Sequence, residues 1–226
     1  MKVLNLYACL GGNRLKWDEV AKEKGIEIEV TAVELDEELA KLYQERFPND
    51  KVIVADAHQY LLDHYKEFDF IWSSPPCPSH SKIRITQKTR STFKAVYPDM
   101  KLYEEIIFLD NYFTGKYVVE NVTPYYEPLI QAQKRGRHLY WTNFTLPTDI
   151  RERKLDGTLC SMKNEREVLE KFHDYKFKAN VGGCRDILRN LVDYEAGRTI
   201  FETALGIVKK KDINQTDIFD FINEEM

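Results

Sequence analysis

Apolar and polar positions alternate regularly through the first 121 residues. Short apolar runs predict strands at residues 2–7, 27–34, 51–56, 68–73 and 116–121. Between them, apolar residues recur at helical spacing within residues 13–24, after Asp36, from Ala57 onward and within residues 100–113. Strands that alternate with helices are typical of a parallel sheet covered on both faces. The pattern therefore predicts an α/β fold with a doubly wound, mostly parallel sheet.

The pattern weakens after residue 121. Residues 138–144 predict one more strand, and a polar region follows it. Two helical segments are predicted at about 192–207 and 216–225.

Charge is unevenly distributed along the 226 residues. The 33 basic and 37 acidic residues give a net charge of −4, which is unlike the basic balance of a nonspecific nucleic-acid binder. Residues 82–101 nevertheless contain six lysines and arginines against one acid, and a second basic group spans residues 134–138. Either group is interpreted as a solvated face or as a phosphate-binding surface.

Two absences limit the class of protein. No run of about 18 apolar residues and no signal-peptide pattern are present, so we expect a cytoplasmic protein without a membrane partner. Four cysteines lack C-x-x-C spacing, so neither a metal site nor a disulfide framework is expected.

The predicted strand ends carry the candidate chemistry, because ligands of open parallel sheets bind beyond the carboxyl ends of the strands. Gly11 and Gly12 follow the first strand but lack G-x-G-x-x-G spacing, which disfavours a nicotinamide or flavin cofactor and the oxidoreductase class. Glu34 could accept hydrogen bonds from a ribose, and Asp56 from an exocyclic amine, although Asp56 also suits a helix N-cap. These residues favour a nucleoside without a pyrophosphate, such as S-adenosylmethionine.

The order of the motifs resembles that of the cytosine-C5 DNA methyltransferases, in the small bacterial or phage type. The matching segments, over about residues 3–145, are LNLYACLGG, VELD, VADAH, PPC, ENV and QKRGR. RNLV at 189–192 loosely resembles the last motif of that family. The resemblance implies a core at 1–145, a reduced target-recognition region at 146–188, and C-terminal helices at 189–226 that return to the core.

The resemblance also implies roles for individual residues. The catalytic residues would be Cys77, Glu120, Arg135 and Arg137. The cofactor-binding residues would be Tyr7, Ala8, Gly11, Gly12, Glu34, Leu35, Asp56, Ala57, Pro76 and Asn190. The DNA-binding residues would be Ser81, Lys82, Arg84, Lys88 and Arg90, on a loop that closes over the DNA. The implied partners are double-stranded DNA and a cognate restriction enzyme.

The implied mechanism agrees with the chemistry of these residues. Carbon 5 of cytosine is a poor nucleophile until a thiolate adds to carbon 6, which is the role of Cys77. Glu120 would protonate N3, and the two arginines would favour the thiolate through their positive charge. A stacked base cannot reach Cys77, so the target nucleotide must flip out of the duplex.

Three residues depart from the family pattern. Asn5 and Cys9 stand where the first motif has an acid and a glycine, which predicts weak cofactor binding, and Pro78 replaces the usual glutamine. Two alternatives stay open, an RNA cytosine-C5 methyltransferase and a catalytically retired binding module. The Cys-Phe-Thr motif typical of the RNA-directed branch is absent, and the joint retention of Cys77, Glu120 and both arginines argues against the second alternative.

Overall fold

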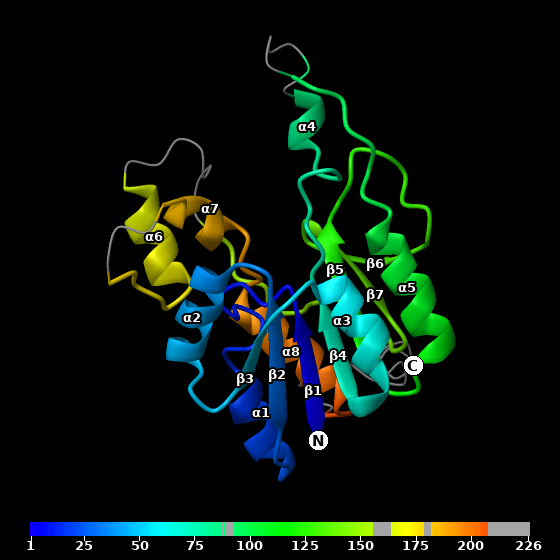
Figure 1. Ribbon diagram of the computed structural model, residues 1–226, viewed down its shortest axis with the longest axis vertical. Coiled ribbons are helices and arrows are strands. Elements are labelled where there is room, and N and C mark those ends of the chain that lie inside the picture. Colours follow the sequence, from blue (N-terminus) through cyan, green and yellow to red (C-terminus); the bar gives the residue numbers. More distant parts are fainter. Residues whose placement is uncertain (87, 89–92, 156–163, 179–181, 208–226) are drawn as a thin grey trace, which may run out of the picture.

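A seven-stranded sheet runs through the centre of the computed structural model (Figure 1), which describes residues 1–86, 88, 93–155, 164–178 and 182–207. The predicted helix at 216–225 and the predicted contact residue Arg90 lie outside the described residues. The strands are β1 (Lys2–Leu6), β2 (Glu29–Glu34), β3 (Lys51–Val54), β4 (Phe70–Ser73), β5 (Lys116–Val122), β6 (Gln133–Arg135) and β7 (His138–Thr142).

The order of the strands is β3-β2-β1-β4-β5-β7-β6. β1 to β5 are mutually parallel, whereas β7 is antiparallel to both β5 and β6. The predicted doubly wound, mostly parallel sheet is therefore confirmed. The chain winds outward from β1 to β3 and then in the opposite direction from β4, so strand order reverses between β1 and β4. Ligands bind at such a switch point in open α/β sheets.

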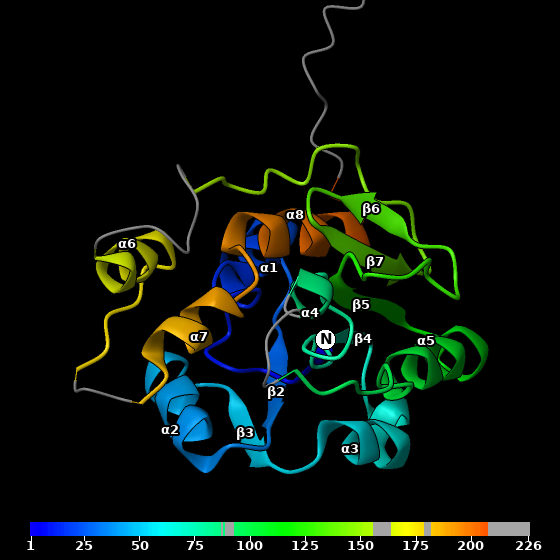
Figure 2. The same cartoon turned by 90° about the horizontal axis from the view of Figure 1, so that it is seen from above.

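Helices cover both faces of the sheet (Figure 2). They are α1 (Trp17–Lys24), α2 (Glu37–Arg46), α3 (Ala57–His64), α4 (Ile83–Thr86), α5 (Lys101–Tyr112), α6 (Glu165–Phe172), α7 (Cys184–Arg189) and α8 (Tyr194–Ala204), with a 3₁₀ turn at Tyr65–Glu67. α3 and α5 pack on one face, and α1 and α8 pack on the other. α6 and α7 lie side by side beyond the edge of the sheet, near α2.

Several helix ends follow directly from the sequence. Asp36 caps α2 by accepting hydrogen bonds from the backbone nitrogens of Glu38 and Leu39, and Gly25 ends α1 in the left-handed region with φ 73°. The first helix starts later than residue 13, because residues 11–16 form turns before Trp17. The pattern of apolar residues did not predict β6, α6 or α7.

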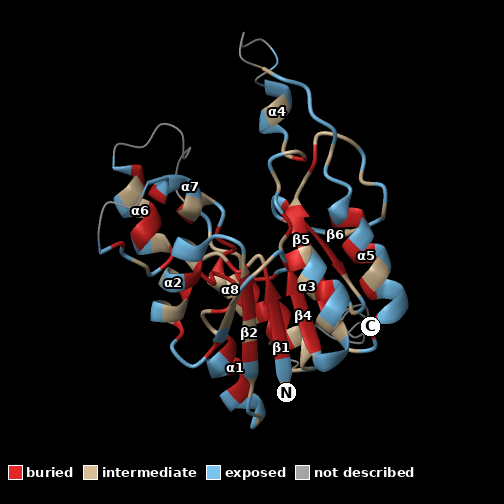
Figure 3. Ribbon diagram, viewed as in Figure 1, coloured by how far each residue is buried: buried red, intermediate tan, exposed pale blue. Residues whose placement is uncertain are grey.

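The chain after residue 190 returns to the first strand. Phe201 of α8 stacks on Trp17 of α1 with ring centroids 5.1 Å apart, and both rings are fully buried against Phe70. Figure 3 shows that the central strands β1, β4 and β5 are mostly buried along their length. A Cβ atom on Gly197 would overlap the backbone of Asn13, so α8 contacts the turn after β1 more closely than a side chain would allow. This return brings residues 189–192 to the carboxyl end of the sheet.

None of the helices in the described ranges has both the length and the apolar character that a membrane span needs.

Candidate active site

The carboxyl ends of β1, β2, β4 and β5 surround a cavity of about 710 Å³. We call it the main cavity. Its lining includes ten predicted site residues, Tyr7, Glu34, Leu35, Asp56, Ala57, Pro76, Cys77, Glu120, Arg137 and Asn190. Predicted residues from seven separate motifs therefore meet at one place. Other predicted residues do not line the cavity, namely Ala8, Gly11, Gly12, Ser81, Lys82, Arg84, Lys88 and Arg135.

Cys77 lies in a stiff turn that follows β4. Asn121 of β5 holds this turn through a hydrogen bond from its Nδ2 to the carbonyl oxygen of Pro75 (2.9 Å). The carbonyl oxygen of Cys77 accepts hydrogen bonds from the backbone nitrogens of His80 and Ser81, both at 3.0 Å. The backbone that carries the thiol is therefore held in place, and Asn121 is a positioning residue that the ENV motif contains but that our prediction did not include.

The charge balance around the thiol differs from the expected one. Burial raises the pKa of the Cys77 thiol, the negative charge of Glu120 raises it further, and Arg137 lowers it. The predicted cationic field thus does not prevail, because desolvation of the thiolate outweighs one arginine. The resting protein holds Cys77 as a thiol.

Glu120 lies close to the end of β5, and its side chain is only 9% exposed. On the neighbouring strand β7 it pairs with Tyr140, whose ring is fully buried. The Nε2 atom of His138 is 3.7 Å from Glu120 Oε1. The carboxylate is therefore largely removed from water at the wall of the main cavity.

Arg135 has a different role from the predicted one. Its Nη2 donates to the carbonyl oxygen of Leu146 (2.7 Å) and its Nε to that of Pro147, so its guanidinium holds the loop after β7. Gly136, with φ 53°, reverses the chain between β6 and β7, and only Arg137 lines the cavity. The QKRGR motif gives both arginines the same expected role. Their different positions depend on the turn at Gly136, which the motif alone does not reveal.

The other end of the cavity contains the acids of β2 and of the α3 N-terminus. Glu34 Oε2 accepts from the backbone nitrogen of Cys9 (2.8 Å), and Oε1 accepts from that of Asp36 (3.1 Å). Asp56 caps α3 through Gln59, and this hydrogen bond is the main cause of its lowered pKa. Asp56 also lines the cavity, so the capping and binding interpretations are compatible.

A buried hydrogen-bond network fixes Tyr7, one of the predicted cofactor-binding residues. Its hydroxyl donates to Oε1 of Glu105 (2.6 Å), a fully buried carboxylate of α5. Ser73 Oγ donates to the other oxygen (2.5 Å), and His58 Nδ1 lies 3.0 Å from Oε1. An acid within the apolar stripe of the predicted helix at 100–113 was the available signal for this network.

Gly11, Gly12 and Asn5 make contacts inside the protein and do not line the main cavity. A Cβ atom on Gly11 would overlap the ring of Phe47, and one on Gly12 would overlap the backbone of Val192. Both glycines therefore allow internal packing, and this packing explains them without the predicted cofactor-binding role. Asn5 is buried and accepts from Asn13 Nδ2 (2.8 Å) outside the cavity, so its missing charge does not bear on the lining. Cys9 does line the cavity, with φ 47°.

Four predicted DNA-contact residues, Ser81, Lys82, Arg84 and Lys88, lie on an arm that projects beyond the carboxyl end of the sheet (Figure 1). The described part of this arm is residues 78–86, 88 and 93–100. Arg84 Nη2 donates to the carbonyl oxygen of Lys94 (2.6 Å), and its guanidinium lies over the Phe93 ring. Lys82 and Lys88 are exposed. Arg84 therefore shapes the arm, while the lysines are open to a partner.

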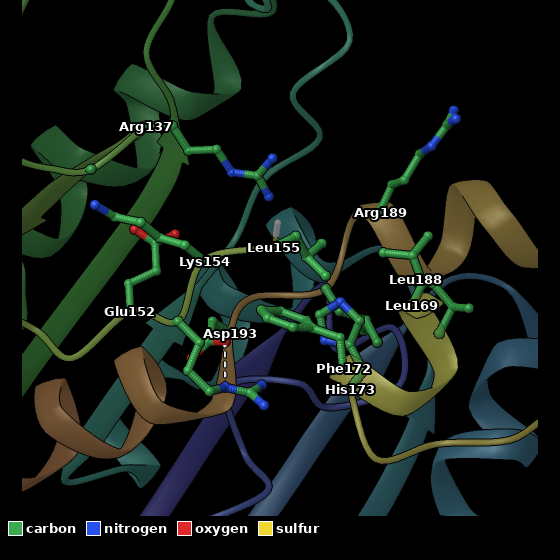
Figure 4. Close-up of a pocket in the computed structure, with 13 residues that line it drawn as sticks. Arg137, Glu152, Lys154, Leu155, Leu169, Phe172, His173, Leu188, Arg189 and Asp193 are labelled. Carbon is green, nitrogen blue, oxygen red and sulfur yellow. Dashed lines mark hydrogen bonds and ion pairs between the residues drawn. The ribbon is translucent and has the colours of Figure 1, made fainter. Parts of the chain in front are cut away.

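A smaller cavity of about 390 Å³ adjoins the main one, and Arg137, Arg189 and Leu191 line both (Figure 4). Arg153 lies 3.6 Å over the Tyr194 ring and binds Asp193 at 2.9 Å. Burial and the nearby arginines lower the pKa of His173 to about 4, so this imidazole is neutral at pH 7. Described residues of the region 146–188, among them Glu152, Leu155 and Phe172, line this smaller cavity.

Comparison with known proteins identifies the family of the chain and one solved structure that matches it over nearly its full length. A family model described as C-5 cytosine-specific DNA methylase matches residues 1–124. The structure of a DNMT2 variant from Spodoptera frugiperda is 25% identical over 54% of this chain, with a TM-score of 0.38, and this chain spans only 35% of that protein. The methyltransferase EhMeth from Entamoeba histolytica covers 93% of this chain and 99% of its own, with a TM-score of 0.55 at 11% identity, which shows a shared fold. No curated protein matches the chain.

Proposed function

Because this chain belongs to the family of C-5 cytosine-specific DNA methylases, we propose that it transfers a methyl group from S-adenosylmethionine to carbon 5 of cytosine in double-stranded DNA. One observation carries the proposal. Cys77, Glu120 and Arg137 line the same cavity as Glu34 and Asp56, so a nucleophile and a nucleoside site share one space.

The donor set at the β2 end of the cavity fits a nucleoside. Each Glu34 oxygen already accepts one backbone hydrogen bond and keeps lone-pair capacity for a ribose hydroxyl. Leu35 is 68% exposed although it lines a cavity, which suits stacking of a flat base on its side chain. When bound, S-adenosylmethionine supplies an electrophilic methyl group on its sulfonium.

The chain's own groups activate the cytosine. Cys77 releases its proton to water and its sulfur forms a bond to carbon 6, while the ring electrons shift toward N3 and Glu120 transfers a proton to N3. Carbon 5 then has enamine character and can take up a methyl group. Once water has taken the proton from carbon 5, the C–S bond breaks, the ring regains its double bond, and N3 returns its proton to Glu120. Cys77 leaves as a thiolate and regains a proton from water.

A target cytosine with fluorine at carbon 5 tests the covalent route. Fluorine cannot leave as a proton, so enzyme and DNA stay joined after one methyl transfer, and a denaturing gel shows a shifted band. Cys77→Ala should abolish the band and leave cofactor binding intact. A band that survives in Cys77→Ala would disprove this assignment of the nucleophile.

A methyl-transfer assay distinguishes DNA from RNA as the substrate. Radiolabelled S-adenosylmethionine with duplex DNA and with RNA of the same sequence should label the DNA. Label on RNA alone would identify an RNA cytosine methyltransferase, and no label from a protein that binds the cofactor would identify a retired module. Bisulfite sequencing of DNA from cells that express the protein then gives the recognition sequence.

A further inference from the structure

His138 lies between two carboxylates at the wall of the main cavity. Its side chain is 8% exposed. Nε2 is 3.7 Å from Glu120 Oε1, and Nδ1 is 3.2 Å from Oε1 of Glu152. Nδ1 is buried and has no well-aligned hydrogen bond, although a buried imidazole nitrogen normally has a partner. The ring is therefore poised between two acceptors on opposite sides.

Glu152 reaches this position because of the turn before His138. A Cβ atom on Gly136 would overlap Glu152 Oε2, so only glycine admits the carboxylate there. Figure 4 shows Glu152 and Arg137 on the same side of the smaller cavity. The side chain of Glu152 is 21% exposed, whereas that of Glu120 is 9% exposed, so Glu152 is the member of the pair nearer to water.

Other charged and titratable groups surround the pair. Arg137 belongs to the turn between β6 and β7, Cys77 to the turn after β4, and Tyr140 and Asp193 lie on β7 and before α8. Burial raises the pKa of Tyr140 well above its ordinary value, and Glu120 and Glu152 raise it further, so this hydroxyl stays protonated. Two carboxylates therefore face the imidazole, and Arg137 is a nearby basic side chain at this wall.

We propose that His138, with Glu152 behind it, is a positioning residue that supplies Glu120 with a proton. The inference rests on the function proposed above. As Glu120 gives its proton to N3, His138 passes its Nε2 proton to Glu120 Oε1 and keeps its Nδ1 proton directed at Glu152. When the C–S bond breaks, N3 returns its proton to Glu120, and Glu120 returns one to His138, so every proton is recovered. A histidine between a reacting acid and a carboxylate that orients it follows the logic of the hydrolase triad.

The nitrogen spectrum of the imidazole tests this arrangement without turnover. The chain has five histidines, so the ring nitrogens of His138 can be assigned by their loss in His138→Gln. We expect Glu120→Gln to shift the Nε2 resonance and Glu152→Gln to shift the Nδ1 resonance. Insensitivity of both nitrogens to both variants would show that the ring only packs, and would overturn the inference. This result stands even if the wild-type protein methylates nothing, which would overturn the proposed function alone.

Methylation kinetics give the second test. His138→Gln should lower kcat by about 10- to 100-fold with an unchanged KM for S-adenosylmethionine, as expected for a group behind a reacting one. Because the lost group holds the spare proton, the loss should grow with pH, and the alkaline limb of the rate profile should move to lower pH. Glu152→Gln should change the pH profile in the same direction by a smaller amount, because the side chain of Glu152 is partly exposed to water.

His64 provides the matched control, because its Nδ1 pairs with Glu67 at 2.6 Å on the surface of α3, away from the cavity. His64→Gln should leave kcat and the pH profile unchanged. Wild-type kcat in His138→Gln at every pH, or a loss in that variant that is the same at every pH, would overturn the inference.

Discussion

Two backbone N–H groups hold the carboxylate of Glu34 before any ligand arrives. A charged acceptor that is already oriented should bind ribose hydroxyls with little loss of entropy. We therefore expect Glu34→Gln to weaken S-adenosylmethionine binding by about 10-fold or more, because a hydrogen bond to a charged group contributes about 1.5–3 kcal/mol.

Isothermal titration calorimetry measures the loss, and thermal unfolding should show that the fold persists. Glu29→Gln is the control, since Glu29 is exposed at the opposite end of the same strand. Equal affinities in Glu34→Gln and the wild type would remove Glu34 from the binding site.

Cys77 allows a prediction about pH at the same scale. Burial and Glu120 raise the pKa of its thiol, so the reactive thiolate forms only as the pH rises above the range of an ordinary cysteine. Glu120→Gln removes one cause of the raised pKa and should speed alkylation by iodoacetamide at pH 8 up to about tenfold. Arg137→Gln removes the opposing charge and should slow it.

Mass spectrometry of the tryptic peptide 67–82, in which Cys77 is the sole cysteine, gives the rates. Cys9 serves as the internal reference, because burial and Glu34 raise the pKa of its thiol to about 12 and keep it unreactive. Slower alkylation in Glu120→Gln would contradict this account of the charges.

The motifs predicted well which residues meet at the cavity. They predicted less well the direction in which each side chain points. The ends of parallel strands share one edge of a sheet, so Glu34, Cys77 and Glu120 come together once the strand order is known. Arg135 turned out differently because a single glycine with positive φ separates it from Arg137. The buried Glu105 depends on contacts between α5, β1 and α3, which no local pattern contains.

At the scale of helices and strands, apolar periodicity predicted the elements that bury a continuous face. β1, β2, β4, β5, α2, α5 and α8 all have such faces. β6 has three residues and none is fully buried, and α7 has six residues, so their patterns are too short to distinguish from a loop. α6 buries Leu169 together with the acids Glu165 and Glu170, and this mixture conceals its inner face.

The contact between α8 and the turn after β1 gives a prediction about stability. Gly197→Ala places a methyl group against the backbone of Asn13, which cannot rotate away, so the helix must shift. The free energy of unfolding should fall by about 1–3 kcal/mol, the usual cost of overpacking. Gly182→Ala is the control, because a Cβ atom there meets nothing within 4 Å. Urea unfolding measures both, and equal midpoints for the two variants would show that α8 tolerates the shift.

At the scale of the whole molecule, basic side chains are concentrated near the opening of the main cavity although the protein is acidic. The net charge is −4, yet Lys82, Arg84 and Lys88 lie on the arm beyond the carboxyl end of the sheet, where the main cavity opens. Arg137 lines both cavities at this end. An acidic protein with a locally basic approach to its cavity would attract a polyanion in one orientation.

The arm yields a prediction about salt. Lys88 is exposed, so in the proposed function it would contact a phosphate and release a counterion on binding. Lys88→Ala should weaken binding to all duplex sequences alike and reduce the slope of log affinity against log salt by about 0.9. Lys41→Ala removes the same charge from the exposed surface of α2 and should leave the slope unchanged, which separates a phosphate contact from the effect of net charge. Fluorescence anisotropy with labelled duplexes across a salt series measures both. An altered sequence preference with an unchanged slope in Lys88→Ala would show that the arm reads bases, because only a base contact distinguishes one duplex from another without releasing counterions.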